Sequence, residues 1–238
     1  MFLKYMKPFL LVFVLFSSFY NSKAQTNYTY EELIAKASLF HLQKDSKNAI
    51  ENFENAFSIQ PPNALNAYKA SSVYALNENK SKAFEYLNIA LDKGWTEAEA
   101  LSIDPYFDFL RSNYKKEWEA ITERAFKNEK QFEKTIKLPE LRRQINAMTI
   151  QDQRIRYLKI QTSDPNQLAN LQQQINELDF KNLTQAKEII KKYGWPKISE
   201  IGKDGSNNLW LIVQHADQDI FFKKSFKCNA QANWNKRN

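Results

Sequence analysis

Cysteine, glycine, proline and histidine are all scarce in this chain of 238 residues, which contains 1 Cys, 4 Gly, 7 Pro and 2 His. One cysteine cannot form an internal disulfide, so the fold must depend on packing. Four glycines are too few for β-barrels and nucleotide-binding α/β sheets, which place glycine in tight turns and phosphate loops. No GxGxxG, P-loop or CxxC motif occurs, and no other catalytic signature is intact. The composition therefore favours an all-α fold.

The first 24 residues have the pattern of a secretory signal peptide. Lys4 and Lys7 precede an apolar run over residues 9–16, and the segment ends in the small-x-small pattern Ser22 to Ala24. The apolar run is shorter than the roughly 20 residues that span a bilayer. We therefore expect cleavage after Ala24, with an uncleaved anchor as the alternative. Since no later stretch could span a membrane, we expect a soluble protein secreted by the general export pathway, either periplasmic or extracellular.

The net charge is modest once this segment is removed. Loss of its three lysines, Lys4, Lys7 and Lys23, lowers the formal charge from +7 to +4. Basic and acidic residues are interleaved along most of the remaining chain, which is typical of a solvated helical surface. We therefore expect no nucleic-acid partner.

The first half contains an internal repeat with a period of 34 residues. Within each unit, small residues at helical spacing allow a paired helix to approach, and aromatic residues fill the gap. The seven residues Leu33, Ala37, Phe40, Ala49, Phe53, Ala56 and Pro61 correspond to Ala67, Ser71, Tyr74, Ala83, Leu87, Ala90 and Trp95. This pattern over residues 30–95 resembles the tetratricopeptide repeat, with Lys36 and Ala67 as its weakest positions. An unrelated helical bundle is the alternative.

A partial third unit follows the second repeat. Gly94 is expected to end a helix, and Asp104-Pro105 to begin the next. The DPxFxxLR sequence over 104–111, followed by Trp118, looks like the cap of short repeat arrays in exported bacterial proteins. We assign residues 25–127 to a tetratricopeptide-like domain. The resemblance implies a concave groove for a protein or peptide ligand, although short arrays also serve as spacers or dimer surfaces.

A second helical domain is expected over residues 138–238. The charged residues 111–137 predict a long helix, with 128–137 as a connector, and Pro139 starts the next helix. There Leu141, Ile145, Met148, Asp152 and Ile155 fall on one helix face. Asp152 is a carboxylate on this apolar face and needs a partner, because an unpaired buried charge costs on the order of several kcal/mol. Arg156, one turn along, can reach it.

Three further elements are predicted towards the C-terminus. One helix carries an apolar stripe over 168–178, and a second, over 184–193, is expected to begin at the N-cap Thr184 and to end at Gly194 and Pro196. The apolar run at 208–215 fits a strand or a helix, and we assign it to a helix because its surroundings are helical.

Three motifs in this region carry a second resemblance. Asp152-Gln153 with Arg156, then YGWP at 193–196, then WLIVQHAD at 210–217, resemble a bacterial family known as domain of unknown function 6624. The resemblance covers about residues 138–226 and implies a fold and candidate residues but no activity. The family pattern would continue with another amphipathic helix, whereas residues 226–238 have no helical apolar face. We therefore expect a truncation or a reading-frame change near Lys227.

Histidine-based chemistry is restricted to His215, because His41 lies among the packing residues of the first repeat. The catalytic candidates are Asp152, Arg156, His215 and Asp217, and the metal-ligand candidates are His215 and Asp219. The alternative is a structural polar network that ties His215 to Asp152 and Arg156. We expect non-catalytic protein or peptide binding in the cell envelope, without a cofactor. A hydrolase-like or metal-assisted enzyme centred on His215 and Asp152, with the repeats recruiting substrate, is the alternative.

Overall fold

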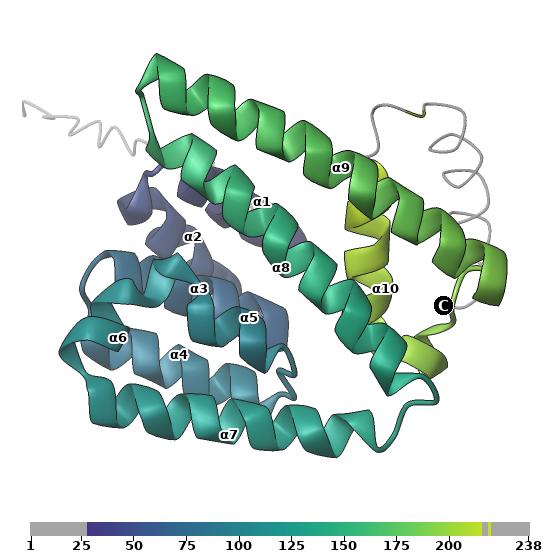
Figure 1. Ribbon diagram of the computed structural model, residues 1–238. Helices are drawn as coiled ribbons and strands as arrows, with labels where there is room; N and C mark the ends of the chain where they lie inside the picture. Colours follow the sequence, from purple (N-terminus) through teal and green to yellow (C-terminus); the bar gives the residue numbers. More distant parts are fainter. Residues whose placement is uncertain (1–27, 216–218, 220–238) are drawn as a thin grey trace, which may run out of the picture.

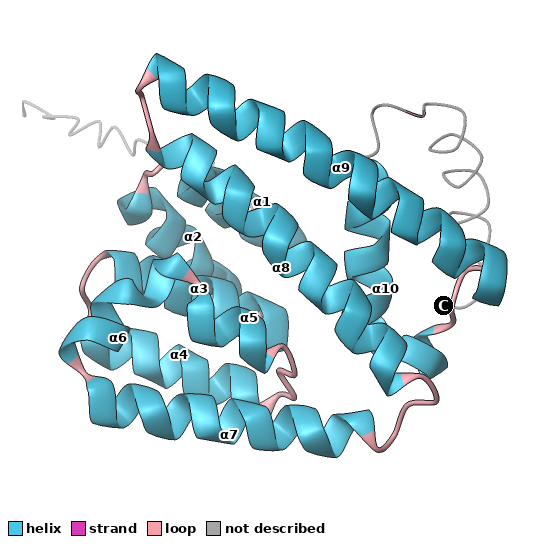
Figure 2. Cartoon of the chain, viewed as in Figure 1, coloured by secondary structure: helices cyan, strands magenta, loops and turns pink. Residues whose placement is uncertain are grey.

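The computed structural model describes residues 28–215 and residue 219, and within these residues it contains helices and no strand (Figures 1 and 2). The all-α prediction is confirmed. The elements are α1 (Tyr30–Leu42), α2 (Ser46–Ile59), α3 (Ala64–Leu76), α4 (Lys80–Asp92), α5 (Ala98–Ile103), the 3-10 helix η1 (Pro105–Phe107), α6 (Asp108–Asn113), α7 (Lys115–Glu133), α8 (Pro139–Gln161), α9 (Pro165–Tyr193) and α10 (Ile198–Gln214). No helix in the described ranges is both long and apolar enough to cross a membrane.

The backbone of the first half repeats with the period seen in the sequence. The hairpins α1–α2 and α3–α4 start at Tyr30 and Ala64, which are 34 residues apart. Both hairpins turn through a non-glycine residue with positive φ, and these residues, Lys44 (61°) and Glu78 (56°), are again separated by 34 residues. The N-caps Asp45 and Asn79, which open α2 and α4, have the same separation. The sequence period is therefore a period of helical hairpins.

Small residues hold each pair of helices close together. Ala37 and Ala49 are fully buried between α1 and α2, and Ser71 and Ala83 are fully buried between α3 and α4. The Ser71 hydroxyl donates a hydrogen bond of 2.7 Å to the Ala83 carbonyl oxygen. A larger side chain at these positions would push the helices apart, because protein interiors are close-packed.

The partial third unit covers the second hairpin as the sequence predicts. Its four apolar residues are all buried: Leu101, Phe107, Leu110 and Trp118. Asp104 accepts a hydrogen bond from the Tyr106 backbone N–H, so η1 begins at Pro105. The apolar edge of α3 and α4 is therefore protected from solvent.

The long helix predicted over residues 111–137 is wrong at both ends. α6 ends at Asn113, and α7 occupies only Lys115–Glu133. The break falls at Tyr114, whose φ is −136°, and whose ring packs edge-to-face against Phe84 and Phe109. Aromatic packing from two neighbouring elements therefore outweighs the local helix propensity of this charged segment.

In the second half, α8, α9 and α10 surround a separate apolar core (Figure 1). The core residues are Leu141, Ile145, Met148, Ala186, Ile189, Ile201, Leu209, Ile212 and Val213. Pro139 opens α8, Gly194 with φ 67° ends α9, and 208–214 is helical, all as predicted.

The predicted division near Thr184 is wrong, because α9 runs unbroken from Pro165 to Tyr193. No glycine or proline lies between residues 166 and 193 to interrupt it. The Thr184 hydroxyl donates to the Phe180 carbonyl oxygen one turn earlier (3.0 Å), an arrangement that a helix interior tolerates. Thr184 therefore is not an N-cap.

A buried arginine joins the two halves of the molecule. Arg142 on α8 is fully buried and donates to Asp204 on α10 (2.8 Å) and Glu129 on α7 (3.0 Å). It also reaches Glu133 (3.4 Å) and the Thr96 carbonyl oxygen (2.7 Å) before α5. Residues 128–133 of the expected connector thus lie in α7, and Glu129 and Glu133 among them contact this arginine.

Gly202 permits the close approach of α10 to α7. It has φ 77° inside α10, and a Cβ atom there would lie 2.8 Å from the Phe132 ring. A larger residue would meet both backbone strain and a steric clash. The kink in α10 is therefore tied to its contact with α7.

Candidate functional site

Four ionisable side chains meet where α8, α9 and α10 converge, and we call them the α8–α10 cluster: Asp152, Arg156, Asp179 and His215. Asp152 and Arg156 are one turn apart on α8, and Asp179 lies in the middle of α9. His215 is the C-cap of α10. The cluster therefore draws on three helices that are separated in sequence.

Asp152 is the centre of the hydrogen-bond network. His215 Nδ1 lies 2.9 Å from Oδ2 and 3.1 Å from Oδ1 of this carboxylate. Arg156 donates from Nε to Asp152 Oδ1 (3.0 Å) and from Nη2 to Asp179 Oδ1 (2.5 Å). Gln153 Nε2 adds a bond of 2.7 Å to Asp152 Oδ2. The Asp152 side chain is only 1% exposed, so this set of donors compensates for its burial.

The pKa values of the two carboxylates, Asp152 and Asp179, are shifted in opposite directions. Burial raises the pKa of Asp152, but hydrogen bonding and charge from His215 and Arg156 outweigh it, so the pKa is lowered. At Asp179 burial is the largest effect, and it raises the pKa despite the contact with Arg156. The negative charge of Asp152 acts in the same direction. Neighbouring carboxylates with diverging pKa values are typical of sites with acid–base or ligand-binding roles, and they also occur in structural networks.

The Asp152–His215 pair fixes the orientation of the imidazole. Because a carboxylate accepts, the hydrogen lies on Nδ1, and the neutral ring then presents Nε2 as an acceptor. The His215 side chain is 23% exposed, so the ring reaches solvent while its partner is buried. This arrangement is chemically able to accept a proton from a molecule at the surface.

The structure brings together three of the predicted site residues, Asp152, Arg156 and His215. Asp219, predicted as a metal ligand with His215, forms an ion pair with Lys187 (2.7 Å). The group whose ligand atoms lie within 4.8 Å of one another consists instead of Asp152, Asp179 and His215. Asp217 lies outside the described residues.

Asp179 was not among the site residues predicted from the sequence. It follows Ile175 by four residues, and Ile175 belongs to the apolar stripe predicted for this helix. The signal was therefore the same one that identified Asp152: a carboxylate that continues an apolar helix face.

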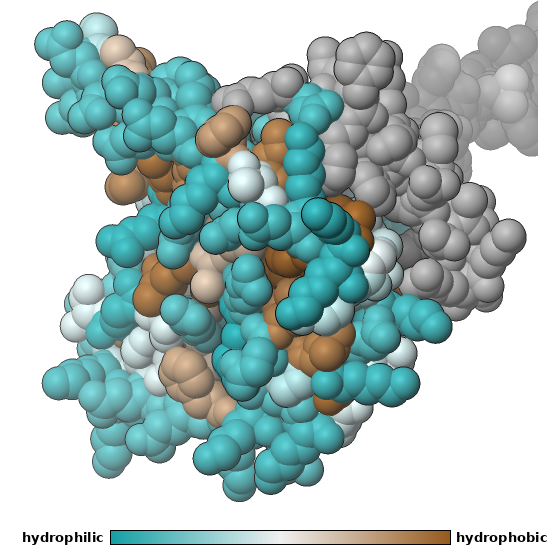
Figure 3. Space-filling model, turned by 45° about the vertical axis from the view of Figure 1, so that its right-hand side comes forward, coloured by the Kyte–Doolittle hydropathy of each residue, from teal (hydrophilic) through white to brown (hydrophobic). Residues whose placement is uncertain are grey.

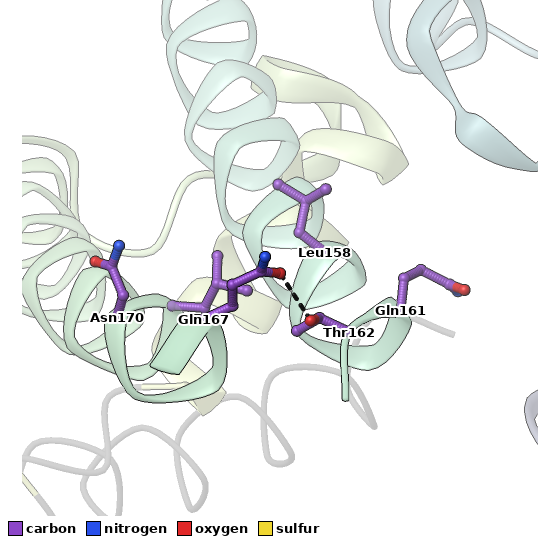
Figure 4. Close-up of a pocket in the computed structure, with 6 residues that line it drawn as sticks. Leu158, Gln161, Thr162, Gln167 and Asn170 are labelled. Carbon is purple, nitrogen blue, oxygen red and sulfur yellow. Dashed lines mark hydrogen bonds between the residues drawn. The ribbon is translucent and has the colours of Figure 1, made fainter. Parts of the chain in front are cut away.

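An open pocket of about 470 Å³ lies at the tip of the α8–α9 hairpin, apart from the cluster. It is lined by Leu158, Gln161, Thr162, Gln167, Asn170 and Leu171. Figure 4 shows Gln167 turned towards Thr162, whose hydroxyl donates to it (2.8 Å). Leu158 follows Asp152 by six residues, or about 9 Å along a helix. Because its lining contains no titratable side chain, the pocket offers no acid–base group of its own.

Comparison with known proteins gives a match for the second half only. No curated protein and no solved structure matches the chain. Residues 139–234 match the family described as "Family of unknown function (DUF6624)". The match includes α8, α9 and α10 and thus every member of the α8–α10 cluster, so this region of the chain is similar to a family without a stated activity.

Proposed function

We propose that the protein is exported and binds a protein or peptide partner in the cell envelope through its helical hairpins. The resemblance to tetratricopeptide repeats and the 34-residue period of the backbone both support this function. Stacked hairpins of this kind act through surfaces and contribute no reactive groups. The described part of the first half likewise contains one histidine, His41, which is in edge-to-face contact with Tyr106.

The observation that carries this proposal is a pair of exposed leucines at the same position in both hairpins. Leu42 and Leu76 are the last residues of α1 and α3, and they are 74% and 46% exposed. Leu39, one turn before Leu42, is 52% exposed. Exposed apolar side chains that recur at the same position of both hairpins favour contact with a partner. Figure 3 shows apolar patches within one mainly hydrophilic face of the molecule.

The proposed export rests on residues 1–24, which lie outside the described residues. Their charge, apolar run and small-x-small ending support a signal peptide. Fractionation of expressing cells, followed by N-terminal sequencing, tests this part. A mature chain that begins at Gln25 outside the cytoplasm agrees with the proposal. A chain that retains Met1 or stays in the cytoplasm contradicts it.

Partner binding is tested with the double variant Leu42→Ser/Leu76→Ser. The matched control is Ile160→Ser, because Ile160 is 67% exposed on α8, in the other half. In cross-linking with the exported full chain, wild type and control should capture the same partner, and the double variant at least tenfold less. Equal capture by all three chains, or cross-links only between copies of this chain, would contradict partner binding through this surface.

A second candidate function is acid–base catalysis at the α8–α10 cluster, of the hydrolase type. The observation that favours it is the buried Asp152 held 2.9 Å from the partly exposed His215. The test is a screen of the wild-type chain against ester, phosphate and peptide substrates, with His215→Gln beside it. Turnover that His215→Gln abolishes supports catalysis, and turnover that it leaves unchanged excludes His215 as the base.

A further inference from the structure

The α8–α10 cluster has the composition of a metal site as well as that of a salt bridge. We propose that Asp152, Asp179 and His215 bind a divalent first-row transition-metal ion, with Thr149 and Asn182 completing its ligand set. This inference does not depend on partner binding by the hairpins. Two carboxylates and one imidazole match the ligands of Mn²⁺, Fe²⁺ and Zn²⁺, whereas Mg²⁺ and Ca²⁺ prefer oxygen alone.

The spacing of the three ionisable ligands fits one ion. One ligand atom from each of Asp152, Asp179 and His215 lies within 4.8 Å of the other two. Ligands that share a metal at about 2.0–2.2 Å lie roughly 3–4 Å apart, depending on the coordination angle. Small rotations of the side chains therefore suffice to bring these atoms around one ion, and the helices need not move.

Two buried polar atoms supply an independent observation. Thr149 Oγ1 and Asn182 Nδ2 have no hydrogen-bond partner within the described part of the molecule. Thr149 is 7% exposed and Asn182 is 3% exposed, so solvent does not readily compensate them. Buried polar atoms are nearly always paired, and those that are not point to a missing ion, water or ligand.

The two orphan side chains are next to the cluster in sequence, on the same helix faces. Thr149 precedes Asp152 by three residues on α8, and Asn182 follows Asp179 by three residues on α9. Residues three apart share a helix face, and α8 and α9 run antiparallel, so both lie one turn below the carboxylates, towards the apolar core. An amide side chain can turn over to present its oxygen in place of its nitrogen. Thr149 Oγ1 and Asn182 Oδ1 then add two neutral oxygen ligands.

The charges of the cluster also suit a divalent ion. The two aspartates and Arg156 sum to −1 when His215 is neutral. Arg156 occupies one oxygen of each aspartate, and the remaining Asp179 oxygen accepts no hydrogen bond from the described residues. That oxygen is therefore available to a metal while Arg156 remains in place. A metal at His215 Nδ1 takes the position of the hydrogen, which moves to Nε2 in the other neutral tautomer.

The test measures metal binding by the untagged full chain after treatment with a chelator. Mn²⁺ and Zn²⁺ are added separately, the bound metal is quantified by elemental analysis after gel filtration, and Mn²⁺ affinity is measured by electron paramagnetic resonance. We expect one ion per chain and a higher melting temperature with metal. Asp179→Asn should weaken binding at least tenfold. The control Asp104→Asn, a carboxylate bonded to Tyr68 in the first half, should leave binding unchanged.

A second variant keeps the test decisive if Asp179→Asn does not fold. Thr149→Val preserves the shape of the side chain and removes only the orphan hydroxyl, so it should fold, while its metal affinity should fall severalfold. A purely structural network would give no stoichiometric metal with either ion. That result, or equal metal affinity in wild type, Asp179→Asn and Thr149→Val, would overturn the proposal.

Discussion

Two buried polar clusters in the described part of the chain differ in how completely their hydrogen-bonding groups are paired. Arg142, fully buried at the junction of the two halves, donates to three carboxylates and one backbone carbonyl. The α8–α10 cluster pairs its central Asp152 equally well, yet leaves Thr149 and Asn182 unpaired beside it. Complete pairing indicates a structural role, whereas incomplete pairing at similar burial indicates a place for something else.

The largest effect is expected when the junction loses its arginine. Arg142→Met leaves Glu129, Glu133 and Asp204 close together without their shared cation, and it should cost about 3–5 kcal/mol of unfolding free energy. The control is Arg143→Met, whose neighbouring arginine is 46% exposed and pairs with Glu133 and Glu140 at the surface. That variant should cost under about 1 kcal/mol. Urea denaturation measures both, and equal losses would mean that the junction is not specially stabilised.

Replacing the arginine of the α8–α10 cluster by methionine should lower the unfolding free energy by less. Arg156→Met removes one partner of Asp152, which keeps His215 and Gln153, so we expect a loss of about 2 kcal/mol. Arg154→Met is the control, because Arg154 is exposed on the same helix. Thermal unfolding of the two variants gives the difference. A loss as large as that of Arg142→Met would show that the cluster is as structural as the junction.

The contrast between these arginines shows where sequence reasoning stops. Arg142 and Arg143 are adjacent and chemically identical, and only the packing of α7 and α10 against α8 buries one and exposes the other. Asp152 and its contact with Arg156 could be predicted, because both the apolar stripe and the partner are local on α8. The contact of His215 with Asp152 could not be predicted in the same way, because α10 meets α8 only in the folded chain.

For the rest of the fold too, features that depend on local sequence could be predicted, and features that depend on tertiary contacts could not. The hairpin period could be predicted from small residues such as Ala37 and Ala49, because small residues recur 34 positions later at Ser71 and Ala83. The break at Tyr114 could not, because it depends on rings from α4 and α6 that only meet in the folded chain. The N-cap predicted at Thr184 is wrong because a threonine serves equally as a cap and as a residue that bonds back within a helix.

A pH titration of stability tests the electrostatics around Arg142 at the junction. Burial and the nearby Asp204 raise the pKa of Glu97 from 4.5 to about 7, although Asn208 and Arg142 oppose the shift. Between these two values the folded state binds more protons than the unfolded state, so stability should fall as the pH rises from about 4.5 to 7. We expect Glu97 to contribute about 1–2 kcal/mol to this fall, allowing for the partial exposure of its side chain.

The Glu97 effect is isolated by comparing wild type with Glu97→Gln. The glutamine cannot ionise, so its stability should lack this contribution, and the difference between the two chains should grow as the pH rises from 4.5 to 7. Denaturation at pH 5 and pH 8 measures it. A difference that stays constant between the two pH values would contradict the raised pKa. Asp204→Asn should reduce the shift, because it removes the neighbouring negative charge.

The smallest expected change in stability is that of Thr149→Val, and it tests the difference between the junction and the α8–α10 cluster most directly. Thr149→Val removes an unpaired buried hydroxyl, so the metal-free chain should become more stable by up to about 1 kcal/mol. Thr122→Val on α7 is the matched control, because that hydroxyl donates to the Trp118 carbonyl oxygen (3.0 Å) and its loss should destabilise by a similar amount. Opposite signs in urea denaturation would mean that Thr149 is kept at a cost to folding, which a structural role does not explain. A loss of stability in both variants would instead mean that the Thr149 hydroxyl is satisfied in solution, and the contrast between the junction and the α8–α10 cluster would disappear.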